Sequence, residues 1–247
     1  MANIQKTRAI ILVTRPFKES SLFCSLLTQR FGKIKVLAKG VRRPKSRLCG
    51  ALEPFTLSEI IFYKRESKEV YNLSTAEVIE CFEETRKSPQ KVKAAQVICE
   101  FFDKTLPMEE VDERIFMFFL SFLKNLDEAP ESEARILALS YLWRALASAG
   151  VKPHLENCVR CHKPINFASK KIDFSIGAGG LVCEKHFDDT VIFLNPETVN
   201  TLRAIYINES IRMTEHSVSE IEKLIPDYLY YHLSNLALNS LKHLHKM

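Results

Sequence analysis

Four residues in the second half of the chain have the types and spacing of a metal site. Cys158 and Cys161 form a CxxC pair, Cys183 and His186 form a CxxH pair, and twenty-one residues separate the two pairs. Thiolate and imidazole groups are the usual ligands of structural zinc, and such pairs are typical of a treble-clef or ribbon-type knuckle. The pattern therefore predicts one structural zinc ion. Three glycines let the chain bend sharply before the second pair: Gly177, Gly179 and Gly180.

The choice of ligands leaves alternatives open. Cys158, Cys161 and His162 also spell CxxCH, the attachment motif of c-type haem. Haem attachment needs export or a specialised compartment, and the N-terminus shows no signal segment. Within the zinc interpretation, His162 or His154 could replace His186 as the fourth ligand.

Catalysis at this metal is not expected. A zinc hydrolase or deaminase needs an open coordination position with a neighbouring Glu as general base. Here no HxE precedes a PCxxC, and Glu184 lies between two ligands. The chain also has no GxxxxGK[ST], GxGxxG, GxSxG or HExxH motif. We therefore expect that the protein is not an enzyme.

The first fifty residues are strongly basic. They hold twelve Lys and Arg and a single acid, Glu19, a balance of +11, so the other 197 residues carry −6 of the total of +5. Seven of these bases fall in one acid-free run of fifteen residues: Lys33, Lys35, Lys39, Arg42, Arg43, Lys45 and Arg47. Such a run indicates a surface that meets polyanions.

The basic run has the alternation of a strand followed by a loop. In a strand over 33–39 the lysines share one face, and Ile34, Val36 and Ala38 share the other. The apolar face packs inward, and the lysine face forms the floor of a groove for a phosphate backbone. The arginines of the following loop can hold phosphates through paired hydrogen bonds.

A solvated edge strand is the simpler explanation of the lysines, because exposed lysines also prevent edge-to-edge aggregation. It does not explain seven bases without an acid, since ordinary surfaces mix both signs. Charge alone does not separate DNA from RNA or from an anionic membrane, although no amphipathic basic helix is evident. We expect nucleic-acid contact. Phe17, Phe23 and Phe31 could stack on bases, but strand aromatics are mostly core residues, so they are not included.

The elements that would position these residues are strands first and helices later. Five strands are predicted: Thr7–Val13, Ser21–Gln29, Lys33–Lys39, Phe55–Tyr63 and Glu69–Val78. Gly32 closes the hairpin between the second and third, at a position that needs a positive φ. Five strands in about eighty residues suit a small closed barrel, and the OB-fold is the leading candidate, although other small barrels fit the count.

Helical periodicity begins after residue 85. The predicted helices run from Ser88 to about Lys104, then over Asp112–Leu126, Glu131–Ala149, Asn195–Tyr206 and Ser217–Leu244, with Pro226 kinking or restarting the last. The expected fold is therefore α+β. An OB-like five-stranded β-barrel for nucleic-acid binding occupies residues 1–82, and a helical domain occupies 83–247 and carries a zinc-binding module at 151–190.

The composition of the chain indicates the cellular compartment in which the protein is expected. The chain has 46% hydrophobic and 26% charged residues, as soluble globular proteins do. No apolar run approaches the roughly 20 residues that span a bilayer, and no signal peptide is evident. We expect a cytoplasmic protein whose Cys24, Cys81 and Cys99 are small buried hydrophobes rather than disulfide partners.

Four stretches of the N-terminal part carry a family pattern. They are TRPFKESS at 14–21, TQRFGK at 28–33, LAKGVRRPKS at 37–46 and LEPF at 52–55. A helical part, a cysteine knuckle with Gly179-Gly180 before its second pair, and a long terminal helix follow. In this order the chain resembles the RecO family of bacterial DNA-repair proteins over essentially its whole length, most specifically in the N-terminal motif.

The resemblance implies an N-terminal OB-fold and a helical C-terminal domain with a zinc knuckle. It implies recombinational DNA repair: binding of single-stranded and double-stranded DNA, annealing of complementary strands, and assistance to RecA loading on DNA coated with single-stranded DNA-binding protein. The implied partners are RecR and the C-terminal tail of that coating protein, at the nucleoid. The family's ligands, where zinc is present, are usually four cysteines, and His186 departs from that pattern.

The residues taken without the resemblance leave other functions open. The main alternative is a zinc-containing OB-fold protein that binds RNA or associates with the ribosome. A zinc-containing transcription regulator and a metal hydrolase are further classes.

Overall fold

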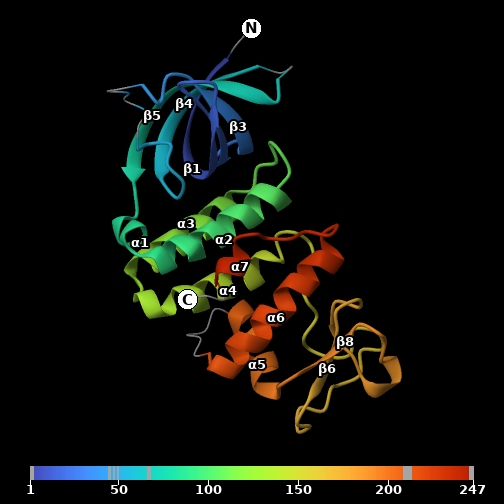
Figure 1. Ribbon diagram of the computed structural model, residues 1–247. Helices are drawn as coiled ribbons and strands as arrows, with labels where there is room; N and C mark the ends of the chain where they lie inside the picture. The colour runs from blue at the N-terminus through green and yellow to red at the C-terminus, as the bar shows by residue number, and fades with distance from the viewer. Residues whose placement is uncertain are drawn as a thin grey trace. The chain divides into compact units, whose positions relative to one another are not determined.

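The computed structural model describes residues 3–43, 46, 48, 50–65, 68–207 and 213–244 (Figure 1). The chain divides into two compact units, Met1–Ala134 and Arg135–Met247. Among its described residues, the first unit combines the five predicted strands with three α-helices. This division therefore falls later in the chain than residue 82, where the strand pattern of the sequence ends.

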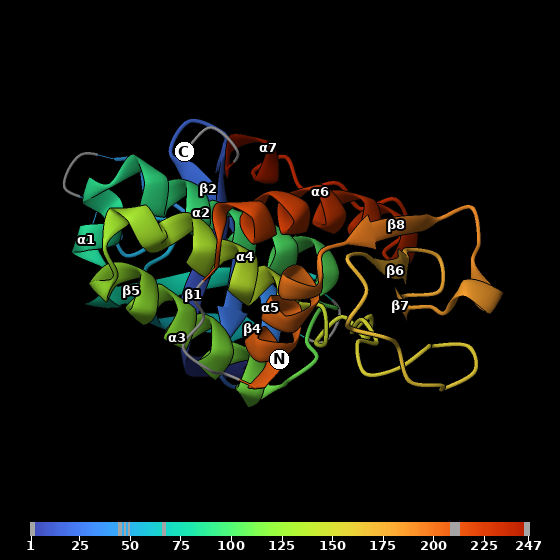
Figure 2. The same ribbon diagram turned by 90° about the horizontal axis from the view of Figure 1, so that it is seen from below.

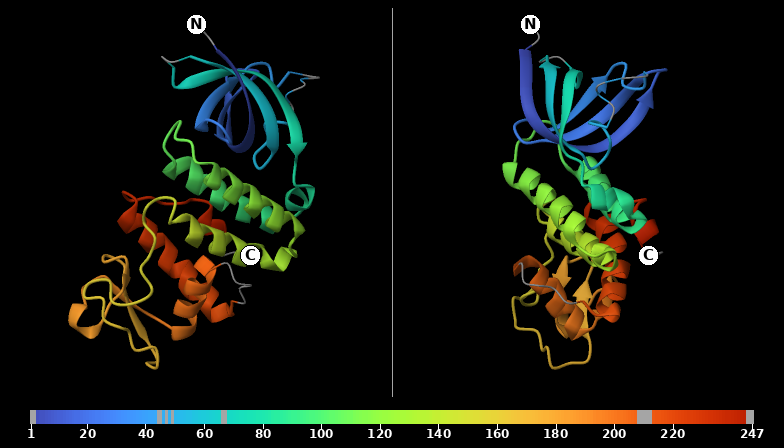
Figure 3. Two further views of the ribbon diagram at one scale, coloured as in Figure 1. Left: turned by 180° about the vertical axis from the view of Figure 1, so that it is seen from behind. Right: turned by 90° about the vertical axis from the view of Figure 1, so that its left-hand side faces the viewer.

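The five strands of the first unit close into a barrel, which Figure 3 shows from two sides. They are β1 (Asn3–Phe17), β2 (Ser21–Thr28), β3 (Gly32–Ala38), β4 (Leu57–Lys64) and β5 (Val70–Glu80), in the order β1-β2-β3-β5-β4. Neighbours are antiparallel except β3 and β5, which pair in parallel between Lys35–Leu37 and Val70–Asn72. The prediction of a five-stranded OB-like barrel is confirmed.

Alternate residues of the strands fill the barrel interior, as a period of two requires. On β3 the three apolar side chains predicted to face inward, Ile34, Val36 and Ala38, are fully buried there. They pack with Cys24 and Leu26 of β2 in a single hydrophobic core. The face assignment of this strand is therefore confirmed for its apolar side.

Strand β1 is longer than predicted. The expected strand stopped before Arg15, but pairing with β2 continues through Pro16, opposite Leu22, to Phe17. The register between β1 and β2 shifts between Ile11 and Val13, which marks a β-bulge. A bulge bends a strand and changes which residues face outward beyond it. The sequence pattern has no signal for this extra residue.

Three helices complete the first unit: α1 (Glu83–Lys87), α2 (Pro89–Thr105) and α3 (Glu113–Glu128). The Ser88 hydroxyl accepts a hydrogen bond from Lys91 N and so caps α2, with Pro89 at the first helical position, as predicted. Helix α2 packs against β1. Ile10 of β1 lies between Ala9 and Ile11 of the barrel core and is nonetheless fully buried, as expected for a residue beneath a helix.

The same helix covers the start of β3. Lys33 is only 6% exposed, and its Nζ donates a hydrogen bond to the backbone oxygen of Asp103 at 2.6 Å. The Ser25 hydroxyl donates to the Asp103 carboxylate at 2.5 Å. Beyond α2 the chain returns along β3, where Glu109 N donates to Lys33 O at 2.9 Å. These contacts hold the first residues of β3 against the C-terminal end of α2 and the segment that follows it.

The second unit combines helices with a small sheet. Its helices are α4 (Ala134–Ala145), α5 (Pro196–Ile207), α6 (Glu215–His232) and α7 (Leu241–Leu244). Three strands, β6 (Ile172–Ser175), β7 (Gly180–Leu181) and β8 (Val191–Leu194), form a sheet in the order β7-β6-β8. Figure 2 shows these strands beside the C-terminal part of α6, where His232 Nε2 lies 2.6 Å from Ile176 O.

Two predicted helices differ from the observed ones. The expected helix Ser217–Leu244 is wrong as one element, because α6 ends at His232 and α7 follows separately. Ser234 and Asn235 have positive φ, which no right-handed helix accommodates, whereas Pro226 lies inside α6 without ending it. The expected helix Glu131–Ala149 is shorter, with a 3-10 turn before α4 and further turns up to Gly150.

Gly32 provides a test of the contact between β3 and the segment after α2. Its φ is +62°, as predicted, and a Cβ there would lie 2.1 Å from Glu110 O. Gly32→Ala should therefore cost both the left-handed penalty of about 1–2 kcal/mol and an overpacking cost of about 1–3 kcal/mol. Urea unfolding followed by far-UV circular dichroism measures the loss.

Gly50→Ala is the matched control. Gly50 has a φ of +83°, but a Cβ there would meet nothing within 4 Å. It should cost only the left-handed penalty, about 1–2 kcal/mol. Equal losses in the two variants would contradict the close backbone approach at Gly32.

Candidate metal centre and basic surface

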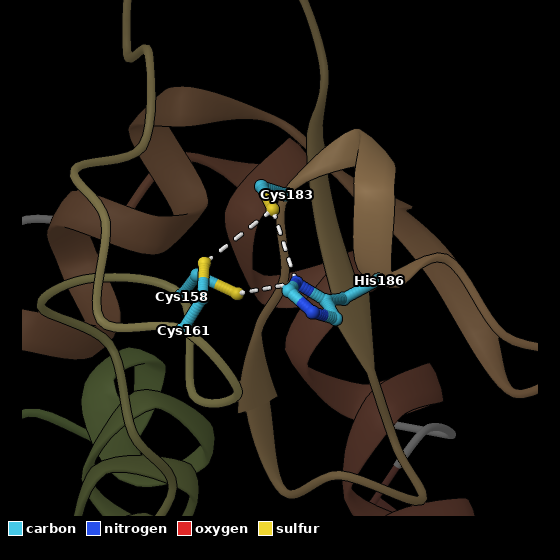
Figure 4. A group of neighbouring side chains, drawn as sticks. All are labelled: Cys158, Cys161, Cys183 and His186. Carbon is cyan, nitrogen blue, oxygen red and sulfur yellow. Dashed lines mark hydrogen bonds between the residues drawn. The ribbon is translucent and has the colours of Figure 1, made fainter.

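The four predicted ligands converge in the second unit (Figure 4). Cys158 and Cys161 come from a tight turn, Cys183 follows β7, and His186 ends a 3-10 turn at Glu184–His186. Their ligand atoms all lie within 4.8 Å of one another. In the part of the chain that the structure describes, no other cluster of His, Cys, Asp and Glu meets this condition with three or more members.

The distances within the cluster fit one tetrahedral ion. His186 Nδ1 lies 3.3 Å from Cys183 Sγ and 3.6 Å from Cys158 Sγ, and Cys161 Sγ lies 3.8 Å from Cys183 Sγ. Ligand atoms bound to tetrahedral zinc at about 2.0–2.3 Å lie roughly 3.3–3.8 Å apart. The cluster could therefore hold one metal ion, and a disulfide between Cys161 and Cys183 is excluded by their separation.

Backbone hydrogen bonds shape the turn that carries the first pair. His162 N donates to Cys158 O at 2.8 Å, and Cys158 N donates to Lys163 O at 2.9 Å. His162 takes a φ of +58° to close the turn. Val159 N donates to Leu181 O at 2.8 Å, which joins the turn to β7. The first pair is thus held beside the strand that leads to the second.

Gly180 permits this arrangement by close approach. Its neighbour Leu181 donates to His154 O, and a Cβ on Gly180 would lie 2.3 Å from that same oxygen. Gly179 has a φ of +76° and supplies the bend before β7. The bend predicted before the second pair is found at Gly179, whereas Gly180 permits a close backbone approach that was not predicted.

The electrostatics of the turn favour a thiolate at Cys158. Burial of this side chain raises its pKa, but backbone N–H groups of Cys161, Cys183 and Arg160 donate toward the sulfur and outweigh burial. The pKa of Cys158 falls to about 6 as a result. A thiolate is the form that binds metal.

The structure distinguishes the candidate fourth ligands. His186 belongs to the cluster, whereas His154 and His162 do not. The Nε2 of His154 lies 2.6 Å from Asn157 Oδ1, and its ring packs edge-on against His162. Three thiols and one imidazole are soft and borderline ligands that select zinc-like ions over magnesium or calcium.

The basic surface lies on β3 and the turn after it. Lys35 and Lys39 are exposed, and so are Arg42 and Arg43. The expectation that Lys33 shares this exposed row is wrong, because α2 covers its side chain and Asp103 O binds its amine. Lys45 and Arg47 lie outside the described residues.

The four exposed cations have no acidic partner within 4 Å among the described residues. Several other cations of the first unit are paired with acids, for example Lys64 with Glu109 at 2.8 Å and Arg86 with Glu53 at 2.9 Å. Lys64 and Tyr71 both bind the carboxylate of Glu109, and Lys64 in particular lowers the pKa of that carboxyl. Unpaired cations gathered on one strand and its turn are free to bind anions.

Two further exposed cations on the same end of the barrel were not selected from the sequence. They are Arg15, opposite Phe23 in the β1–β2 register, and Lys18 in the turn between these strands. Their charge is visible in the sequence, but the bulge that turns the end of β1 is not.

No helix among the described residues is both long and apolar enough to cross a membrane.

Comparison with known proteins covers both parts of the chain. The family model described as Recombination protein O N terminal matches residues 1–82, and the one described as Recombination protein O C terminal matches residues 86–242. The first match spans the whole barrel, and the second includes all four residues of the metal cluster.

Individual proteins similar to this chain belong to the same family as the matching models. A DNA repair protein RecO from Thermoanaerobacter sp. (strain X514) is 30% identical over 92% of this chain and 92% of its own. A second one, from Dehalococcoides mccartyi (strain CBDB1), is 32% identical over 89% of this chain and 87% of its own. A third, from Alkaliphilus metalliredigens (strain QYMF), is 27% identical over 96% and 97%. With the barrel, the helical part and the cysteine knuckle all matched, the chain belongs to the RecO family of DNA repair proteins.

Proposed function

We propose that this protein is a non-enzymatic mediator of recombinational DNA repair. It binds single-stranded and double-stranded DNA, anneals complementary strands, and assists RecA loading on DNA coated with single-stranded DNA-binding protein, together with RecR. The observation that carries the proposal is the group of unpaired, exposed cations on β3 and its turn, Lys35, Lys39, Arg42 and Arg43, in a chain of this family.

Annealing without a nucleotide cofactor follows from charge neutralisation. Two complementary strands repel each other through their phosphates, and cations that replace condensed counterions lower this barrier. A strand bound along β3 meets Lys35 and Lys39 from the sheet and both arginines from the turn. Arginine suits this position because its planar group can bind two phosphate oxygens at once.

The barrel supports this use of its surface. In OB-folds the face formed by strands 2 and 3, with the loops beside it, is the usual oligonucleotide site. Here the free cations lie on β3 and directly after it, and α2 covers the other end of the same face. DNA would therefore lie across the uncovered end of β2 and β3.

We propose zinc as the metal of the cluster, in a structural role. Three cysteines and His186 complete a tetrahedron of protein ligands, which leaves no position for water or substrate. The ion would join the Cys158–Cys161 turn to the segment after β7 and so hold the small sheet of the second unit together.

Removing the free cations should weaken DNA binding and make the binding less dependent on salt concentration. For wild-type protein on single-stranded DNA we expect a log–log salt slope of roughly −3.5 to −5, from about −0.7 for each of five to seven phosphates. Converting Lys35, Lys39, Arg42 and Arg43 to Ala should reduce its magnitude by about 2–3. Fluorescence anisotropy with labelled oligonucleotides at several salt concentrations measures both slopes.

The control removes four exposed cations of helices α1 and α3 and of the C-terminal end of α2, with the same change in net charge: Lys87, Lys104, Arg114 and Lys124. It should leave the slope nearly unchanged. An equal effect of the two sets would mean that total charge, rather than the β3 surface, governs binding.

Strand annealing tests the proposed activity itself. Wild-type protein should accelerate annealing of complementary oligonucleotides coated with single-stranded DNA-binding protein, without ATP, and RecR should modulate the rate. The four-cation variant should anneal markedly more slowly, since its surface screens fewer phosphates. Stronger binding to RNA than to DNA of equal length would instead favour an RNA-binding function.

The metal proposal predicts one zinc ion per chain by native mass spectrometry. Cys183→Ser should lose the ion and increase amide hydrogen exchange over residues 151–190, because the two ligand segments lose their link. His186→Cys should keep the ion, since thiolate replaces imidazole at the fourth position. Cys81→Ser, outside the cluster, is the control and should be fully loaded. Full loading of the Cys183 variant would refute the assignment.

A further inference from the structure

The uncovered end of the barrel carries apolar side chains on its outer face. On β2 and β3 the interior residues are Cys24 and Val36, so their neighbours Phe23 and Leu37 point outward. Phe23 and Leu37 are paired across the two strands and are only half-buried. They therefore place an aromatic and an aliphatic side chain next to each other on the outer face of the barrel, partly open to solvent.

The bulge in β1 brings a second aromatic ring to this pair. Beyond the bulge, Arg15 lies opposite Phe23 and Phe17 lies opposite Ser21, so both point to the outer face. Phe17 is 39% exposed, and its ring centroid lies 6.3 Å from that of Phe23 at an interplanar angle of 59°. Phe31 differs, because it packs edge-on against Phe62 at the barrel core.

Cations surround this apolar patch. A hollow of about 360 Å³ is lined by Phe17 and Leu37 together with Lys18, Lys39 and Arg43. Its volume falls in the range of small-ligand pockets, about 300–1,000 Å³. Lys18 Nζ lies over the Phe17 ring, 5.6 Å from its centroid, as in a cation–π contact.

A hydrogen bond between two loops holds the cations around the hollow. Arg42 N donates to Ser20 O at 3.0 Å, which joins the turn after β3 to the turn between β1 and β2. Arg43 N then donates to Gly40 O at 3.2 Å and closes the turn. Lys18 from one loop and Arg43 from the other therefore line the same hollow.

We propose that Phe17, Phe23 and Leu37 form a stacking platform for an unpaired base of single-stranded DNA. Lys18, Lys39 and Arg43 bind the phosphates on either side of that base. This inference rests on the proposed function and adds to it a contact that is specific for single-stranded DNA. Paired bases are stacked inside a duplex and cannot reach the platform, whereas the cations of β3 serve both forms of DNA.

The proposal separates the two forms of DNA experimentally. Phe17→Ala should lower affinity for single-stranded oligo-dT about 5- to 150-fold, as loss of one base–aromatic stack does. Its affinity for a duplex of equal length should change less than twofold, and its salt slope should equal that of the wild type. Phe17→Leu should also lose affinity for oligo-dT, because an aliphatic side chain offers no ring to a base.

Tyr63→Ala is the matched control. Tyr63 lies on β4 of the same barrel and is 38% exposed, but it does not line the hollow. It should bind both forms of DNA as the wild type does. Circular dichroism of each variant checks that the barrel is intact.

Phe17→Trp gives a direct readout of stacking. The chain has a single Trp, and Trp143 is fully buried, so the new indole supplies the change in signal. Oligo-dT should quench this fluorescence, and duplex should not. Oligo-U at equal concentration shows whether the platform also accepts RNA.

The outcomes distinguish this inference from the proposed function. If wild-type protein binds no oligonucleotide in a salt-dependent manner, the proposed function fails. If the wild type binds and Phe17→Ala leaves oligo-dT affinity unchanged, or lowers oligo-dT and duplex affinity equally, only the stacking platform is overturned. Absence of quenching in Phe17→Trp with bound oligo-dT also overturns it.

Discussion

The packing of α2 on the outer face of the barrel determines which part of that face can meet a ligand. At the covered end, burial lowers the pKa of Lys33, the Asp103 carboxylate opposes this change, and the amine is held by Asp103 O. Two residues further along the same strand, the side chain of Lys35 is exposed. A single strand thus uses one lysine to attach a helix and leaves Lys35 and, directly after the strand, Lys39 exposed. The proposed DNA surface begins where α2 ends.

The features of the barrel and its helix that depend on short-range periodicity were predictable from the sequence. Alternation on β3 identified the inward-facing Ile34, Val36 and Ala38, and the Ser88-Pro89 signal located the start of α2. The sequence could not predict that Lys33 is buried, because its partner Asp103 lies seventy residues away. The bulge in β1 was equally hidden, since one extra residue changes the facing of Phe17 without changing the local composition.

The metal cluster was predictable for a related reason. Each ligand pair is a local pattern, and zinc chemistry restricts the ligand types, so three cysteines followed from spacing alone. The CxxH spacing also predicted His186 as the fourth ligand, but it left His154 and His162 as alternatives because they too lie near a cysteine in sequence. The backbone contacts of the 151–190 segment decide between them: they turn His154 toward Asn157 and bring His186 to the three sulfurs.

The parallel pairing of β3 with β5 has a consequence for synthesis. Lys35–Leu37 pair with Val70–Asn72, so the ribosome must add some thirty-five residues after the basic strand before its neighbour exists. At about 5–20 residues per second this takes roughly 2–7 s. Until β5 is made, β3 lacks its parallel neighbour and the barrel cannot close. Closure through such a non-local pair is intrinsically slow, because the entropy of closing the intervening loop is lost before the pairing stabilises it.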